Sequence, residues 1–188
     1  MYDCPREPPV LTALDPTQAP ADAPLDVSTE STPDAEQLAD DARFMALALE
    51  QARAARDADE VPIGAVIVRD GKLLGVGRNR TRELADPTAH AEMEALREAA
   101  RTVGEQRLVG AVCYTTVEPC FMCAGALSHA RIARAVWGVR DPKFGGCASL
   151  GEVLTDQRLN HQATITEGVE AEAARSLLQE FFRSKRGR

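Results

Sequence analysis

The chain has 188 residues, 44% of them hydrophobic, which suits one domain with a sizeable core. We expect neither a membrane span nor an export or organelle signal, because no run of about 18 apolar residues and no basic, apolar N-terminal stretch is present. The net charge of −7 is uneven: residues 1–42 hold ten acids and one base, and residues 43–188 hold 19 acids and 21 bases. The acidic total therefore does not exclude a phosphate-bearing partner.

Residues 1–34 contain seven of the eleven prolines and many acids, a composition typical of a disordered extension. We therefore predict that the folded domain comprises residues 35–188. Five cysteines, an odd number without an export signal, favour free thiols in a cytoplasmic protein over a disulfide framework.

Apolar residues at helical spacing predict a first helix over Ala35–Arg56, with Asp34 as its cap. The β-rich run Pro62–Arg69, the turn sequence Asp70-Gly71 and the run Leu73–Asn79 then predict a hairpin.

The later elements alternate between helix and strand. We expect, in order, a helix opened by Asp86-Pro87 and ending near Thr102, a strand over Ala111–Val117, a helix from Pro119 to Ala130, strands over Ala135–Val139 and Gln162–Thr166, and a helix over Val169–Phe182. This order predicts an α/β fold: a mixed five-stranded sheet between helices, in a three-layer α/β/α sandwich.

Two short motifs supply candidate metal ligands. Cys120 and Cys123 are three residues apart, so their sulfurs would share one face of a helix, and His90 adds an imidazole. Thiolates and imidazole bind zinc, and helix N-termini favour the thiolate form. Three protein ligands leave a fourth position for water, as in catalytic zinc sites. Glu92 would point away from the ligands and is placed to move the protons of that water.

Neither motif is specific when it occurs alone. Paired cysteines at this spacing also occur in redox and structural zinc sites, and most His-x-Glu sequences are ordinary helix positions. Both motifs in this order, with Pro119 directly before Cys120, favour the catalytic interpretation. The remaining histidines and cysteines lack ligand spacing to this set, and we interpret them as packing or surface groups.

The pattern His90-Ala91-Glu92 with Pro119-Cys120-Phe121-Met122-Cys123 resembles the signature of the zinc nucleobase deaminases. Within that superfamily, residues 40–186 resemble the tRNA-specific adenosine deaminases, which form inosine at the anticodon wobble position. The supporting segments are Val61–Val66, Gly77–Arg80, Cys123–Leu127, Gly138–Lys143 and Phe181–Arg186. The acidic extension is not part of the family pattern.

The resemblance implies a cytidine-deaminase-like fold, one Zn²⁺ per subunit, and hydrolytic deamination with Glu92 as proton shuttle. It also implies a cytoplasmic homodimer that binds the anticodon stem-loop of tRNA. The substrate-binding residues that it implies are Asn79 and Ala91 near the base, Asp141 and Lys143 near ribose and phosphate, and Phe182, Arg183 and Arg186 near the anticodon loop.

Two other functions share these motifs. A deaminase of free guanine, cytosine or a nucleoside would have the same metal site without needing Asp141, Lys143 or the basic C-terminus. An inactive zinc-containing subunit that only binds RNA or a partner would be expected to lose the carboxylate that Glu92 keeps.

Overall fold

The computed structural model describes residues 35–186, and the extension predicted over residues 1–34 lies outside them. The elements are α1 (Ala35–Asp57), β1 (Gly64–Arg69), β2 (Lys72–Arg78), α2 (Ala91–Val103), β3 (Val112–Val117), α3 (Phe121–His129), β4 (Arg134–Val139), β5 (Thr164–Glu167) and α4 (Ala171–Arg186). The strands form one sheet in the order β2-β1-β3-β4-β5. β1 is antiparallel to β2 and β3, and β4 is parallel to β3 and β5. The predicted mixed five-stranded sheet is therefore confirmed.

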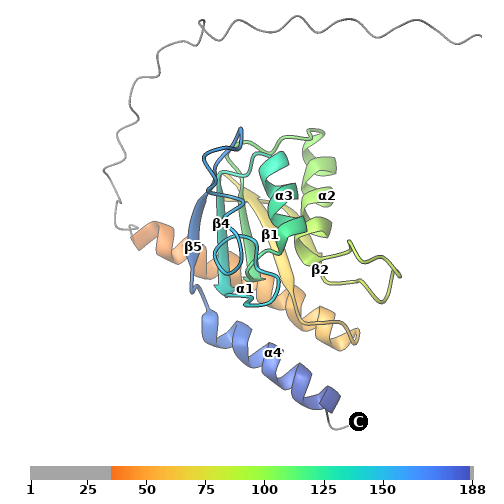
Figure 1. Ribbon diagram of the computed structural model, residues 1–188. Coiled ribbons are helices and arrows are strands. Elements are labelled where there is room, and N and C mark those ends of the chain that lie inside the picture. The colour runs from red at the N-terminus through yellow and green to blue at the C-terminus, as the bar shows by residue number, and fades with distance from the viewer. Residues whose placement is uncertain (1–34, 187–188) are drawn as a thin grey trace, which may run out of the picture. The chain divides into compact units, whose positions relative to one another are not determined.

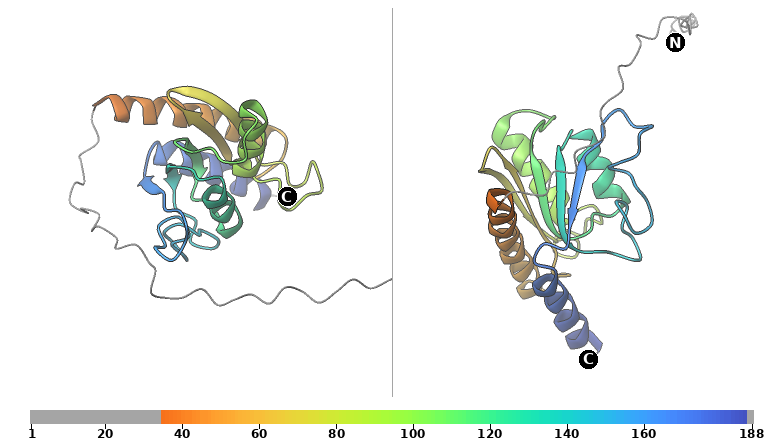
Figure 2. Two further views of the ribbon diagram at one scale, coloured as in Figure 1. Left: turned by 90° about the horizontal axis from the view of Figure 1, so that it is seen from above. Right: turned by 90° about the vertical axis from the view of Figure 1, so that its left-hand side faces the viewer.

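Helices cover both faces of this sheet, as the three-layer prediction requires. Successive residues of β1 point to opposite faces. Ala65 and Ile67 join a core with α2 and α3, whereas Val66 and Val68 join a core with α1 and α4. Figure 1 shows α2 and α3 in front of the sheet and α1 behind it, and the view from above in Figure 2 places α1 and α3 on opposite sides. No helix among residues 35–186 is long and apolar enough to span a membrane.

The hairpin turn has the geometry that its sequence predicts. Asp70 has φ 52° and Gly71 has φ 69°, so both central residues adopt the left-handed conformation of a type I′ turn. Further along β2, Gly77 lies directly beneath the start of α2. A Cβ atom at this position would lie 2.0 Å from the carbonyl oxygen of Ala91, so the glycine permits the close approach of helix and strand.

Three helices begin later than the sequence predicted, α4 by two residues, and the delays of α2 and α3 shape the metal site. α2 begins at Ala91 and not at Asp86, because the Asp86 carboxylate accepts hydrogen bonds from the backbone N–H and the hydroxyl of Thr88, both at 2.7 Å. These bonds hold a turn instead of capping a helix. α3 likewise begins after its proline, with Cys120 at the N-cap position. His90 and Cys120 therefore precede their helices in extended conformation, with ψ of 155° and 169°.

Candidate metal centre and active-site pocket

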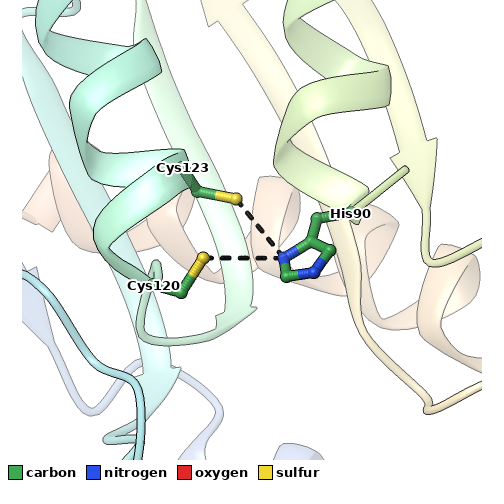
Figure 3. A group of neighbouring side chains, drawn as sticks. All are labelled: His90, Cys120 and Cys123. Carbon is green, nitrogen blue, oxygen red and sulfur yellow. Dashed lines mark hydrogen bonds between the residues drawn. The ribbon is translucent and has the colours of Figure 1, made fainter. Parts of the chain in front are cut away.

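The three predicted ligands converge where α2 and α3 begin. Figure 3 shows His90 facing Cys120 and Cys123, with its Nδ1 atom 3.6 Å from each sulfur. In a tetrahedral zinc site with bonds of about 2.3 Å to sulfur and about 2.0 Å to nitrogen, these atoms lie about 3.5 Å apart. The donor set and its spacing therefore fit zinc. Within residues 35–186 no fourth histidine, cysteine or acidic group joins this cluster, which matches a catalytic site.

The two thiols are electrostatically unequal. A hydrogen bond from Cys123 lowers the pKa of Cys120 to about 4, and the same bond raises the pKa of Cys123. A hydrogen bond with Cys120 also raises the pKa of His90. Metal binding to these groups would displace their protons, because zinc binds thiolate and neutral imidazole. Cys113 and Cys147 are free and buried, as expected of packing residues.

Glu92 lies beside the ligands in the first turn of α2. Its side chain is only 3% exposed, and burial raises its pKa to about 7. A carboxyl group with this pKa can both accept and release a proton near neutral pH, as a general acid–base role requires. Its oxygens are not part of the ligand cluster. Ala91, between His90 and Glu92, is fully buried.

A pocket of about 270 Å³ opens onto this centre. It is lined by Ile63, His90, Glu92, Val117, Glu118, Cys120, Asp141 and Phe144. No sequence motif predicted a site role for Ile63, Val117, Glu118 or Phe144. Of these, Glu118 had a usable signal, since it directly precedes Pro119 and the ligand Cys120.

Asn79 is buried next to the pocket wall, at 5% exposure. Its backbone N–H donates to the carbonyl oxygen of Ile63 at 3.0 Å, and its side-chain Nδ2 donates to Oε2 of Glu60 at 3.1 Å. Glu60 is 1% exposed, and its other oxygen accepts the backbone N–H groups of Arg82 and Glu83 at 2.7 and 2.8 Å. This carboxylate therefore orients the Asn79 amide and holds the turn that follows β2.

Glu118 organises the loop after β4 in the same way. Its Oε1 accepts the backbone N–H groups of residues 147–149 at 2.7–3.1 Å. Its Oε2 accepts the backbone N–H of Asp141 at 3.0 Å and the hydroxyl of Ser149. Burial acts to raise the pKa of Glu118, but these hydrogen bonds outweigh it and hold the pKa below its usual value. Glu118 thus fixes the Asp141 loop against the strand that leads to Cys120.

The remaining predicted substrate contacts form a second group. Lys143 lies with Phe182 and Arg186 in an open, largely apolar cleft against α4. Arg183 is exposed on the same helix, which extends one turn beyond its predicted end. Asp141, only two residues before Lys143, instead lines the metal pocket. The loop after β4 therefore contributes residues both to the metal pocket and to the cleft against α4.

Comparison with known proteins identifies a family and close relatives in sequence. Residues 39–186 match the family described as MafB19-like deaminase. A protein of Agrobacterium fabrum named tRNA-specific adenosine deaminase is 45% identical over 149 residues, which covers 79% of this chain and 98% of the relative.

Two solved structures are also similar. One comes from studies of A-to-I editing by tRNA:A34 deaminases at the wobble position, with a TM-score of 0.70, 45% identity, and coverage of 72% of this chain and 99% of that one. The other is a guanine deaminase of Nitrosomonas europaea, with a TM-score of 0.66, 26% identity, and coverage of 74% and 83%.

Proposed function

The chain belongs to the MafB19-like deaminase family, and on that premise we propose that it converts adenosine to inosine at the wobble position of a tRNA anticodon. The observation that carries this proposal is the pocket itself, which joins a three-ligand metal site to the buried carboxyl group of Glu92. The relatives named tRNA-specific adenosine deaminase support the choice of substrate.

His90, Cys120 and Cys123 would hold one Zn²⁺ per chain, which when bound lowers the pKa of a water molecule to about 7. Glu92 accepts a proton from the attacking water and delivers it to N1 of the adenine ring, while the water oxygen bonds to C6. Glu92 then moves the remaining hydroxyl proton to the amino group. The C6–N bond breaks, and the products are inosine and ammonia.

An anticodon loop suits this pocket, because its adenosine is single-stranded and is extruded at little cost. Asn79, which is hydrogen bonded to the pocket residue Ile63, is proposed to contact the base, and Asp141, which lines the pocket, is proposed to contact its ribose phosphate. The cations on and near α4 would extend binding along the RNA, since basic and aromatic groups suit phosphates and bases. These are Lys143, Arg183 and Arg186, with Phe182 between them.

We further propose that the protein acts as a homodimer in the cytoplasm, where its tRNA substrate is found. Exposed apolar side chains on and near α3 support an interface there, since exposed apolar surface is common at interaction sites. They are Phe121, Leu150 and Leu159, at 48%, 55% and 40% exposure. Sedimentation at micromolar concentration should report a dimer; a monomer with full tRNA activity would contradict this proposal.

The deciding assay measures inosine in a tRNA anticodon stem-loop beside ammonia released from free adenosine, guanine and cytosine. We expect inosine at the wobble position and little release from the free substrates. Ammonia from guanine without inosine in the stem-loop would assign the chain instead to the activity of the guanine deaminase that it resembles in structure.

A further inference from the structure

Phe144 has the largest exposed fraction, 66%, of the exposed large apolar side chains in the described part of the chain. A single exposed apolar residue is ordinary on a protein surface. This one, however, lines the same pocket as His90, Glu92 and Cys120. An aromatic ring therefore lies at the mouth of the metal pocket, with most of its surface available to a ligand.

The backbone that carries this ring is fixed. The N–H of Phe144 donates to Oδ1 of Asp141 at 3.3 Å, and the N–H of Gly145 donates to the Asp141 carbonyl oxygen at 2.9 Å. Gly145 also forms a β-bridge with Cys120, and Glu118 anchors both ends of the loop. The ring is therefore carried by an ordered loop that is paired with the metal ligand Cys120. A ligand that binds the ring loses little affinity to ordering of the loop.

An exposed aromatic face beside a nucleotide pocket is suited to stacking on a base. Such stacking contributes about 5- to 150-fold in affinity per base. The Phe144 ring lies mainly outside the pocket that receives the reacting adenine, so a base outside the pocket is its natural partner. Lys143, the preceding residue, would supply a cation for a phosphate of the same RNA strand.

We propose that Phe144 stacks on the base of a nucleotide that flanks the deaminated adenosine. It is then a specificity-determining residue that favours an RNA loop over a free nucleoside. The inference rests on the proposed function and adds to it a second base-binding position.

The test compares Phe144→Ala, Phe144→Leu and Phe144→Trp with the wild type on an anticodon stem-loop. We expect the Ala and Leu variants to lose about 5- to 150-fold in kcat/KM, mainly through KM, and the Trp variant to retain activity. Zinc content and melting temperature should not change, because the side chain is mostly exposed. Val109→Ala is the matched control: it removes another exposed side chain, 63% exposed, that does not line the pocket.

Stem-loops with an abasic residue on the 5′ or the 3′ side of the target identify the stacked base. The wild-type enzyme should have a lower kcat/KM on one of these abasic stem-loops, by about as much as Phe144→Ala lowers it on the intact stem-loop. Phe144→Ala should cause no further loss on that abasic stem-loop. With the Glu92→Ala variant, the fluorescence of a 2-aminopurine base at that position should be quenched when the stem-loop binds. The quenching should be weaker when the protein also carries Phe144→Ala.

Two results overturn the inference while leaving the proposed function intact. The first is wild-type activity in Phe144→Leu. The second is that Phe144→Ala lowers kcat/KM by the same factor on both abasic stem-loops as on the intact stem-loop. A wild-type enzyme that forms no inosine in the stem-loop overturns the proposed function, and this inference with it.

Discussion

Glu118→Gln tests whether one buried carboxylate holds the pocket loop in place. Glutamine keeps the size of the side chain but replaces one acceptor oxygen with an NH₂ donor. If that donor takes the Oε2 position, the Ser149 hydroxyl can rotate to accept from it, whereas the backbone N–H of Asp141 cannot. One unpaired buried donor costs about 1–3 kcal/mol, and loss of the charge weakens the remaining hydrogen bonds by about 1 kcal/mol more. We therefore expect a loss of about 2–4 kcal/mol in the free energy of unfolding.

Urea unfolding of the zinc-loaded protein measures this loss as a lower midpoint with an unchanged m value. Because the same loop carries Asp141 and Phe144, kcat/KM should fall while bound zinc is retained. Glu167→Gln is the control: Glu167 forms an exposed ion pair with Arg140 at 2.7 Å, beside this loop, and its loss should cost less than about 1 kcal/mol. Equal stability losses in the two variants would refute the argument.

Four further changes test the site and the domain boundary. Cys120→Ser should lose zinc and activity together, and stoichiometric zinc by elemental analysis would contradict the ligand assignment. Glu92→Ala should keep zinc and RNA binding but lower turnover by more than about 10²-fold; loss of zinc, or more than about a tenth of wild-type turnover, would place the proton transfer elsewhere. Gly77→Ala should lower both the melting temperature and the zinc content, because its Cβ would lie 2.0 Å from the Ala91 carbonyl oxygen and force the start of α2 away from β2; an unchanged melting curve would show that α2 adjusts freely. Deleting residues 1–34 should leave zinc content and turnover within a few-fold, and a failure to fold would disprove the predicted boundary.

The fold was predictable wherever the signals are local. The apolar run of β1 and the Asp70-Gly71 turn each lie within a few residues, and the structure keeps both. The start of α2 was not predictable in this way, because an aspartate before a proline suits a turn as well as a helix cap. Its carboxylate contacts Thr88, and the helix begins five residues later, at Ala91. That shift places His90 at the N-cap, in the extended conformation that lets it face the cysteines.

The chemical groups of the site were predictable from two short motifs, but the groups that shape the pocket were not. Glu60 acts on Asn79, 19 residues away, and Glu118 acts on Ser149, 31 residues away, so no local pattern connects them. A glutamate considered alone predicts a solvent-exposed position, since burial of a carboxylate is tolerated only where donors surround it. The loops after neighbouring strands supply those donors: Glu60 precedes β1 and holds the turn after β2, and Glu118 follows β3 and holds the loop after β4. In both cases a carboxylate just before or just after one strand fixes the loop that follows a neighbouring strand. The positions of Asn79 and Asp141 therefore depend on contacts that exist only once the strands have paired.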